Sequence, residues 1–211
     1  PPLRRQRQMC IRDSPITELP GNAGSDFLSS VIKERSLPNF IAIEGPVGVG
    51  KTTLSKKLAD AFGHELILEQ AEENPFLGSF YKNRNQYALA TQLFFLFQRT
   101  RQIQDIRQSD LFAPHKVSDF LIDKDRLFAK VNLDNNEYDL YEQVYAQLTI
   151  NAPTPDLVIY LQAPVDVLMD RIYRRGLTIE QSIDRGYIEM LNQAYSEFFL
   201  YYDEAPLLII N

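Results

Sequence analysis

Cysteine is almost absent from this chain of 211 residues, and histidine is nearly as rare. The single cysteine, Cys10, excludes an internal disulfide framework and any metal cluster built on cysteines. The two histidines, His64 and His115, lack the spacing of metal ligands, so both are expected to be structural. The chemistry of the chain must therefore be sought in other residue types.

Long apolar runs and an excess of positive charge are also absent. No stretch approaches the roughly 20 apolar residues needed to span a bilayer, and no apolar signal-peptide core lies near the N-terminus. The formal net charge of -6 argues against a nucleic-acid partner, because phosphate backbones select basic surfaces. With 45% hydrophobic and 24% charged residues, the composition is that of a globular protein with one core, and we expect a cytoplasmic location.

What the sequence does contain is a glycine-rich segment between a short apolar run and a helical one. Residues 40–53 read FIAIEGPVGVGKTT, which predicts a buried strand, a tight loop and the start of a helix. The spacing Gly45-x-x-x-x-Gly50-Lys51-Thr52 is the Walker A pattern in its required context of strand, loop and helix. A turn that merely joins a strand to a helix would not need this full spacing.

The residue types of this segment explain how it would hold phosphate. Glycines let successive backbone N–H groups turn toward phosphate oxygens, and the helix N-terminus adds partial positive charge. Lys51 can reach the terminal phosphates, and the Thr52 hydroxyl can complete the shell of a Mg²⁺ ion. The sequence therefore predicts that the chain binds a nucleoside triphosphate. The residues expected to contact it are Gly45, Pro46, Val47, Gly48, Val49, Gly50, Lys51, Thr52 and Thr53.

Short strands and longer helices alternate along the chain. Strands are predicted over residues 40–43, 65–69, 115–122, 156–161 and 206–211. Helices are predicted over residues 51–62, 86–109, 127–133, 138–151 and 182–202, with one more opened by Pro164 and broken at Gly176. This alternation is typical of an α/β fold, a parallel five-stranded sheet covered by helices on both faces. Residues 1–37 show no amphipathic period and are expected to be a flexible tail before one domain over residues 38–211.

Two carboxylates are expected near the phosphates, because ligands of open α/β sheets bind beyond the carboxyl ends of the strands. Glu69 ends the second predicted strand, and Asp119 lies in the third. A buried Glu69 would suit a general base, or a partner of Mg²⁺ held through water. An ordinary carboxylate at a strand end on the surface is the alternative.

Two further groups of residues allow more than one interpretation. In the longest predicted helix, Gln92 and Arg99 accompany an apolar and aromatic face that could bind a nucleobase, or could simply pack in the core. Arg171, Arg174 and Arg175 lie near the end of the helix that Gly176 breaks. They could satisfy the last carbonyls of that helix, or fold over a transferring phosphoryl group as a mobile clamp.

From about Phe40 to Asn211 these residues resemble the deoxyribonucleoside kinases of the P-loop kinase superfamily, in particular the bacterial deoxyadenosine and deoxyguanosine kinases. Residues 69–77, EQAEENPFL, are similar to the E-P-V-x-x-N-P segment of that family, and the helix around Gln92 matches its base-binding helix. The strand at 158–161 and the arginine-bearing segment after it look like the family's lid, and this is the most specific of the three matches.

The resemblance implies a P-loop NTPase fold with an arginine-bearing lid, and transfer of the γ-phosphoryl group of ATP to the 5′-hydroxyl of a deoxyribonucleoside. It also implies Mg²⁺ as a cofactor and a homodimer, with no nucleic acid and no membrane as partners. The resemblance also implies roles for single residues. Glu69 would be the general base that activates the hydroxyl, and Arg171 and Arg175 would be the phosphate clamps. Gln92 and Arg99 would contact the nucleobase, Asp119 would be the acid that follows the third strand, and Glu180 would contact the 3′-hydroxyl.

The sequence also departs from the family pattern. An acidic-Arg-Ser/Thr triplet usually follows the third strand, but here the equivalent reads Ser118-Asp119-Phe120. The acid is retained as Asp119, whereas the arginine has no match in register, and either Lys124 or Arg126 could replace it. Elsewhere, a leucine follows Gly176 where relatives often carry arginine, and a glutamine rather than a proline follows Glu69. Relatives continue beyond the last strand, so we expect the native chain to be longer.

Two other functions compete with this interpretation. A nucleoside monophosphate kinase of the thymidylate type shares the P-loop and the lid, but it needs extra cations for the acceptor phosphate, which residues 118–120 do not supply. A P-loop switch or regulator needs neither the lid nor the Gln92 helix. A guanine-reading Asn/Thr-Lys-x-Asp motif, expected in a switch GTPase, is absent from the sequence.

Overall fold

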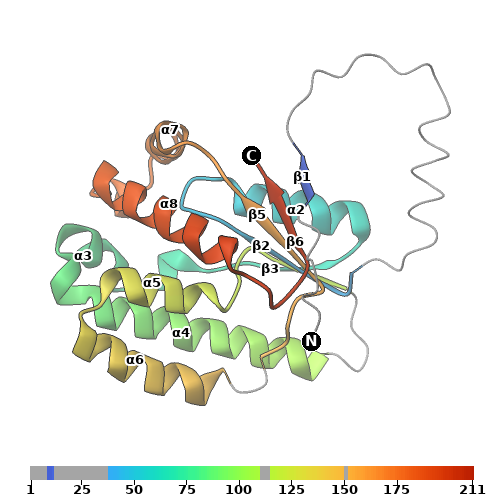
Figure 1. Ribbon diagram of the computed structural model, residues 1–211, viewed down its shortest axis with the longest axis horizontal. Helices are drawn as coiled ribbons and strands as arrows, with labels where there is room; N and C mark the ends of the chain where they lie inside the picture. The colour runs from blue at the N-terminus through green and yellow to red at the C-terminus, as the bar shows by residue number, and fades with distance from the viewer. Residues whose placement is uncertain (1–8, 12–37, 110–114, 150–151) are drawn as a thin grey trace.

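The structure is a computed structural model that describes residues 9–11, 38–109, 115–149 and 152–211. Its centre is a sheet of six parallel strands (Figure 1). From one edge to the other the strands are β3 (Glu65–Ile67), β4 (Lys116–Ser118), β2 (Phe40–Glu44), β5 (Leu157–Leu161), β6 (Leu207–Ile210) and β1 (Met9–Ile11). The five predicted strands are all present, and β1 adds one strand that was not predicted.

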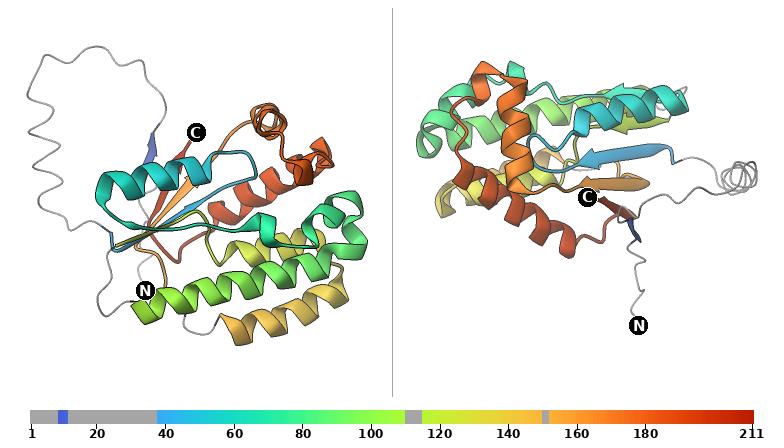
Figure 2. Two further views of the ribbon diagram at one scale, coloured as in Figure 1. Left: turned by 180° about the vertical axis from the view of Figure 1, so that it is seen from behind. Right: turned by 90° about the horizontal axis from the view of Figure 1, so that it is seen from above.

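Seven helices and two 3-10 helices are described in these ranges. They are α2 (Lys51–Phe62), η1 (Ala71–Glu73), α3 (Leu77–Lys82), α4 (Arg84–Ser109), α5 (Lys124–Asn132), α6 (Asn135–Leu148), α7 (Val165–Arg175), η2 (Thr178–Glu180) and α8 (Arg185–Leu200). The view from above in Figure 2 shows α2 on one side of β2 and β5 and α8 on the other. The predicted α/β architecture, with helices on both faces of a parallel sheet, is confirmed.

The central strands are apolar on both faces because helices cover both faces. In β2, every residue after Phe40 is buried, and β5 repeats this pattern. The face under α8 is aromatic: the rings of Tyr160 in β5 and Phe199 in α8 stack with centroids 4.1 Å apart. This packing fixes β5 and α8 against the strand that leads into the glycine-rich loop.

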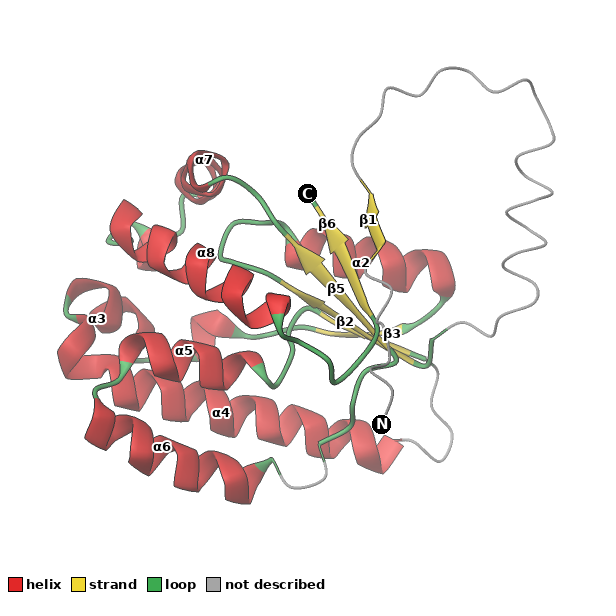
Figure 3. Cartoon of the chain, viewed as in Figure 1, coloured by secondary structure: helices red, strands yellow, loops and turns green. Residues whose placement is uncertain are grey.

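Strand β2 holds the central position because the chain crosses the sheet around it. After β2 the chain runs out to β3, returns to β4 beside β2, and then crosses to β5 on the other side of β2. Ile41 of β2 is opposite Val117 of β4 and Leu157 of β5. In Figure 3 the strand arrows of β5 and β6 point toward the side from which the chain continues into α7. The carboxyl end of β2 is therefore flanked by both neighbours, where ligands of such sheets bind.

Several element boundaries differ from the prediction. The third predicted strand ends at Ser118 instead of residue 122, and α5 begins at Lys124 instead of residue 127. Asp134 caps α6 through the backbone N–H of Glu137, so α6 begins at Asn135, a residue expected to break a helix. The helix start that Pro75 predicts after the turn at residues 70–74 is present as α3, which begins at Leu77.

The expected flexible tail, residues 1–37, lies outside the described residues except for β1. Met9, Cys10 and Ile11 are opposite Leu208, Ile209 and Ile210 of β6. The edge of β6 would otherwise present unpaired N–H and C=O groups, which is the reason why an added strand pairs there.

Candidate active site

The loop between β2 and α2 requires glycine at two positions. Gly45 has φ +153°, and a Cβ atom added there would lie 2.5 Å from the carbonyl oxygen of Leu161 in β5. Gly48 has φ +85°, and its added Cβ would lie 2.9 Å from the carbonyl oxygen of Leu168 in α7. Both obstacles are backbone atoms, so a side chain cannot be accommodated by a small rotation. The loop is consequently pressed against the strand and the helix that lead into the predicted lid.

Lys51 opens α2, and its ammonium group lies over the loop. Its Nζ donates to the carbonyl oxygen of Gly45 at 2.7 Å and to that of Pro46 at 3.4 Å. Burial lowers the pKa of this ammonium group, while the negative charge of Glu44 opposes the effect. The side chain is therefore held at the loop, where its three donors can exchange carbonyl oxygens for phosphate oxygens.

Asp119 connects the P-loop helix with the next strand end. The hydroxyl of Thr52 donates to one carboxylate oxygen of Asp119 at 2.5 Å, and the backbone N–H of Glu69 donates to the other at 2.7 Å. Asp119 is almost fully buried. The structure therefore brings together Thr52, Glu69 and Asp119, which sequence reasoning assigned separately to one end of the sheet.

Glu69 lies just beyond β3 and is held by two cations. One carboxylate oxygen accepts from Nη2 of Arg99 in α4, and the other accepts from Nζ of Lys124 in α5 at 3.2 Å. Burial alone would raise the pKa of Glu69, but the positive charges of Arg99, Lys124 and Lys51 lower it to about 2. The carboxylate is therefore ionised at neutral pH.

Arg99 is more constrained than the sequence suggested. Its second terminal amino group donates to Asp125, its guanidinium lies over the Phe95 ring with 4.9 Å to the centroid, and the side chain is almost fully buried. Both terminal nitrogens are thus engaged by carboxylates in the described residues. Gln92, two turns earlier in α4, is also buried and lines the same cavity as Arg99.

Glu44, the last residue of β2, is a buried carboxylate that was not predicted to take part. It is 0% exposed, and its two oxygens accept from the backbone N–H groups of Gly45 and Leu121 and from the hydroxyl of Tyr195. The ammonium of Lys124 lies 3.5 Å from it. These contacts link the P-loop strand to the loop after β4 and to α8, so Glu44 anchors the loop from below.

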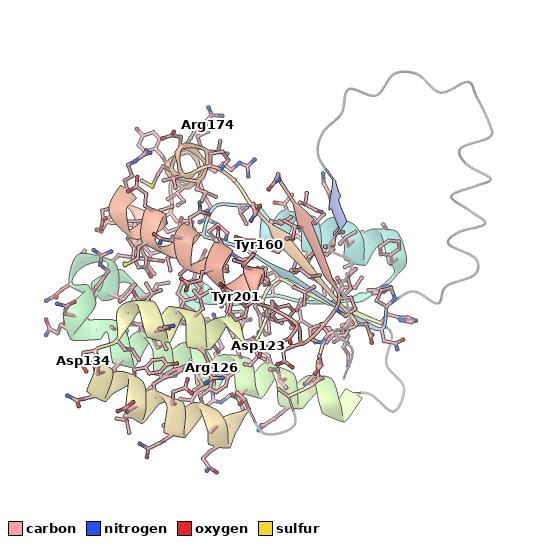
Figure 4. All side chains as sticks on the ribbon, in the orientation of Figure 1. Asp123, Arg126, Asp134, Tyr160, Arg174 and Tyr201 are labelled. Atoms are coloured by element: carbon pink, nitrogen blue, oxygen red, sulfur yellow. The ribbon has the colours of Figure 1, made fainter. Side chains whose placement is uncertain are left out.

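The predicted lid arginines occupy different positions. Arg171 of α7 donates to the carbonyl oxygen of Val49 in the P-loop at 2.9 Å. Arg175 binds Glu180 of η2 through two hydrogen bonds of 3.0 and 2.5 Å. Arg174 instead pairs with Asp170 and points away from the body of the molecule (Figure 4). Of these three arginines only Arg171 therefore touches the loop. Arg175, a predicted phosphate clamp, instead binds Glu180, the predicted contact to the sugar.

One cavity of about 1010 Å³ collects these groups. The side chains assigned from the sequence that line it are Lys51, Thr52, Thr53, Glu69, Gln92, Arg99, Asp119, Arg171, Arg175 and Glu180. Aromatic side chains also line it, among them Phe80, Tyr81, Phe95, Phe128 and Tyr187. The cavity thus has a charged end at the P-loop and an end lined by aromatic rings, a combination that suits a nucleoside.

Two site residues escaped the sequence interpretation, Glu44 and Asp125, and Lys124 was named only as one of two possible replacements for the family's arginine. Glu44 is the only charged residue of a buried strand, and that contrast was a usable signal. Lys124 and Asp125 stand in the run Asp123-Lys124-Asp125-Arg126, which looks like a solvated surface segment. Nothing in that pattern distinguishes the two buried charges from their neighbours.

Metal and membrane features were searched in the part of the chain that the structure describes. No group of three or more His, Cys, Asp and Glu side chains lies close enough to hold a metal ion there. Within the same residues no helix combines the length and the apolar character that crossing a membrane requires.

Comparison with known proteins gives consistent matches. The family model for deoxynucleoside kinase matches residues 41–211. The deoxyguanosine kinase of Bacillus subtilis (strain 168) is 38% identical over 157 residues, which cover 74% of this chain and 76% of that protein. The deoxyadenosine/deoxycytidine kinase of the same organism is 29% identical over 187 residues, covering 84% of this chain and 85% of that protein.

A solved structure agrees with these matches. The deoxyadenosine kinase from M. mycoides, with the products dCMP and a flexible dCDP bound, superimposes with a TM-score of 0.73 and 31% sequence identity. The superposition covers 82% of this chain and 90% of that one. The span that the family model matches, residues 41–211, begins in β2 and includes the P-loop, Glu69, Asp119 and the arginines of α7. This chain belongs to the deoxynucleoside kinase family.

Proposed function

We propose that the chain, through a kinase domain over residues 38–211, transfers the γ-phosphoryl group of ATP to the 5′-hydroxyl of a deoxyribonucleoside. The observation that carries this proposal is the arrangement around Asp119, which hydrogen-bonds Thr52 of the P-loop helix and the backbone of Glu69. A phosphate loop and an ionised carboxylate thereby share one cavity. Donor phosphate and acceptor hydroxyl can meet there, which is most of what phosphoryl transfer requires.

At the donor end, the backbone N–H groups of the loop after Pro46 and the ammonium of Lys51 bind the phosphates. Arg171 already lies on the loop at Val49, so it can neutralise charge on the transferring group, with Arg175 beside it on α7. The hydroxyl of Thr52 and the carboxylate of Asp119 fit a Mg²⁺ ion, since this ion prefers oxygen ligands and takes few of them from protein. Bound there, the ion would neutralise charge on the phosphate oxygens.

At the acceptor end, Glu69 accepts a hydrogen bond from the 5′-hydroxyl and receives its proton as the new bond to phosphorus forms. Gln92 and Arg99 face the base, with Phe95 beside them as an aromatic surface. The pairing of Glu180 with Arg175 supports its role as the contact to the 3′-hydroxyl. Arg99 would then contact the nucleobase while it hydrogen-bonds Glu69, so nucleobase binding and activation of the hydroxyl depend on the same side chain.

A monophosphate acceptor fits this cavity less well. Arg99 and Lys124, the cations next to the proposed base, both line the cavity and bind carboxylates. A second phosphate would have to displace those carboxylates, and one of them is the proposed base. The relatives above are named as deoxynucleoside kinases, which also argues against a monophosphate kinase and against a regulator.

ADP release with ATP and Mg²⁺ tests the function, measured against each of the four deoxyribonucleosides and each deoxyribonucleoside monophosphate. We expect turnover with at least one nucleoside, within the 1–100 s⁻¹ that is roughly typical of kinases. Chelation of Mg²⁺ with EDTA should abolish it, and added Mg²⁺ should restore it. Turnover with monophosphates alone would contradict the proposal. Because the reaction consumes ATP, we place the enzyme in the cytoplasm.

We also propose a homodimer formed through α4 and α6, which pack on each other. Each exposes a large apolar side chain, Phe97 at 46% and Leu140 at 49%. Sedimentation equilibrium should give twice the chain mass for the parent and the chain mass for Phe97→Glu. The control Leu200→Glu alters an apolar residue at the end of α8 that is 64% exposed, and it should leave the dimer intact. A parent that sediments as a monomer would refute this proposal.

A further inference from the structure

Lys124 is a buried lysine between two carboxylates. It is the first residue of α5, and its side chain is 3% exposed. Its Nζ lies 3.2 Å from Oε2 of Glu69 and 3.5 Å from Oε2 of Glu44. A buried ammonium group is costly unless it is paired, and this one is paired twice, once with the last residue of β2 and once with a residue just beyond β3.

The two partners differ in how firmly they are held. Glu44 is fixed by two backbone N–H groups and by the hydroxyl of Tyr195, so it cannot move without disturbing the P-loop strand. Glu69 is fixed at its backbone by Asp119, but among the described residues its carboxylate is oriented only by Arg99 on one oxygen and Lys124 on the other. Lys124 therefore couples the firmly held carboxylate of Glu44 to that of Glu69, which accepts fewer hydrogen bonds.

The geometry points to Lys124 as a positioning residue for phosphoryl transfer, which rests on the proposed function: anchored on Glu44, its ammonium holds Oε2 of Glu69 toward the P-loop. A point charge on a flexible stem suits this role better than a planar guanidinium. When the acceptor hydroxyl donates to Oε2, Lys124 can yield that oxygen and remain paired with Glu44. Arg99 keeps the other oxygen in place.

Arg126, the other cation of this segment, binds α6 and not the carboxylates of the site. Its Nε and Nη2 donate to Glu142 of α6 at 2.9 and 2.6 Å, and its guanidinium lies 5.5 Å from the centroid of the Tyr145 ring. The side chain is 54% exposed and lies on the side of α5 that faces α6 (Figure 4). Of the two candidates for the cation missing after the third strand, the structure thus assigns Lys124 to the site and Arg126 to the surface.

Steady-state kinetics of Lys124→Met and the control Arg126→Met test the assignment, with melting temperature and ATP binding as checks of folding. Lys124→Met should lower kcat by about 100-fold while KM for ATP stays within about threefold of the parent. Lys124→Arg should recover about tenfold of the lost kcat, because it restores the charge in an altered geometry. Arg126→Met should keep kcat within about twofold. Folded Lys124→Met with kcat within about threefold of the parent would overturn the inference.

The same substitution in the Glu69→Gln background separates positioning from an independent role. If Lys124 acts through Glu69, removing it there should lower kcat by at most about threefold further. A further loss of about 100-fold in that background would overturn the assignment. Should Lys124→Met not fold, Lys124→Gln, whose amide can still donate to Glu44, is judged by the same values. A parent inactive with every deoxyribonucleoside would overturn the proposed function, whereas an active parent with an unaffected variant overturns this inference alone.

Discussion

Replacing Glu69 by glutamine should lower turnover by about 10²–10⁴-fold and leave ATP binding nearly intact. Glutamine keeps the size of the side chain and one acceptor oxygen, but it cannot take the proton of the hydroxyl. The loop that binds ATP does not contact this side chain directly: Thr52 reaches it through Asp119, which binds the backbone N–H of Glu69 rather than its carboxylate. Single-turnover kinetics with saturating nucleoside, together with calorimetric titration of ATP, measure both quantities.

The low pKa of Glu69, about 2, bears on how this base acts. A carboxylate so strongly stabilised by Arg99 and Lys124 is a weak base toward a free hydroxyl. Phosphoryl transfer passes through a loose transition state, so the hydroxyl becomes acidic only as its bond to phosphorus forms. Glu69 would therefore orient the hydroxyl first and receive the proton late.

Glu72→Gln is the matched control for this experiment. Glu72 belongs to η1, lines the same cavity and is exposed to solvent. Its neutralisation should change kcat by less than about threefold, since an exposed charge is well screened. Wild-type turnover in Glu69→Gln would remove Glu69 from the chemistry, and equal losses in both variants would point to a general effect of cavity charge.

Gly45→Ala should weaken ATP binding by about 100-fold or more and lower the free energy of unfolding by about 3 kcal/mol. The new Cβ would lie 2.5 Å from the carbonyl oxygen of Leu161 and 3.0 Å from Cγ1 of Val49. Leu161 belongs to β5, which is hydrogen-bonded to β2 and β6 and cannot retreat. The loop has to move instead, and its N–H groups lose their arrangement around the phosphates.

Thermal unfolding measures the stability part of this prediction. A loss of 3 kcal/mol corresponds to a fall in Tm of roughly 6–12 °C for a chain of this size. The control is Gly78→Ala in α3, where the nearest atom to the added Cβ is Cγ1 of Ile179 at 3.5 Å. That variant should be as stable as the parent or more stable by up to about 1 kcal/mol, because alanine favours helix. Parent-like Tm and ATP affinity in Gly45→Ala would contradict the steric argument.

The parts of the fold that follow from local pattern could be predicted from the sequence. The helix over 51–62 was predicted with its observed bounds, because an apolar strand, a glycine-rich loop and a helix leave one local solution. Glu69 and Asp119 could be placed at one end of the sheet by the general rule for parallel strands. Asp134 and Glu137 form a capping box that the sequence contains. It was missed because the two asparagines after Asp134 were interpreted as the end of a helix.

The pairing of charges could not be predicted, since it depends on which elements meet in three dimensions. Arg99 in α4 binds Glu69 after β3 and Asp125 in α5. No local pattern specifies that these three segments meet. From the sequence alone, an arginine with aromatic neighbours suggests a contact to a nucleobase. The same limit applies to Lys124, whose partners Glu44 and Glu69 lie 80 and 55 residues earlier in the sequence.

The contact between Arg171 and Val49 has a consequence for the energetics of nucleotide binding. A free arginine side chain carries roughly 2 kcal/mol of rotamer entropy, which ordering on a ligand would remove. Here the guanidinium is already ordered on a carbonyl oxygen of the P-loop before any phosphate arrives. A phosphate oxygen that replaces that carbonyl exchanges one acceptor for a charged one without freezing the side chain anew. The side-chain entropy of Arg171 is therefore lost during folding, so its loss weakens the affinity for the nucleotide less than it would for a free side chain.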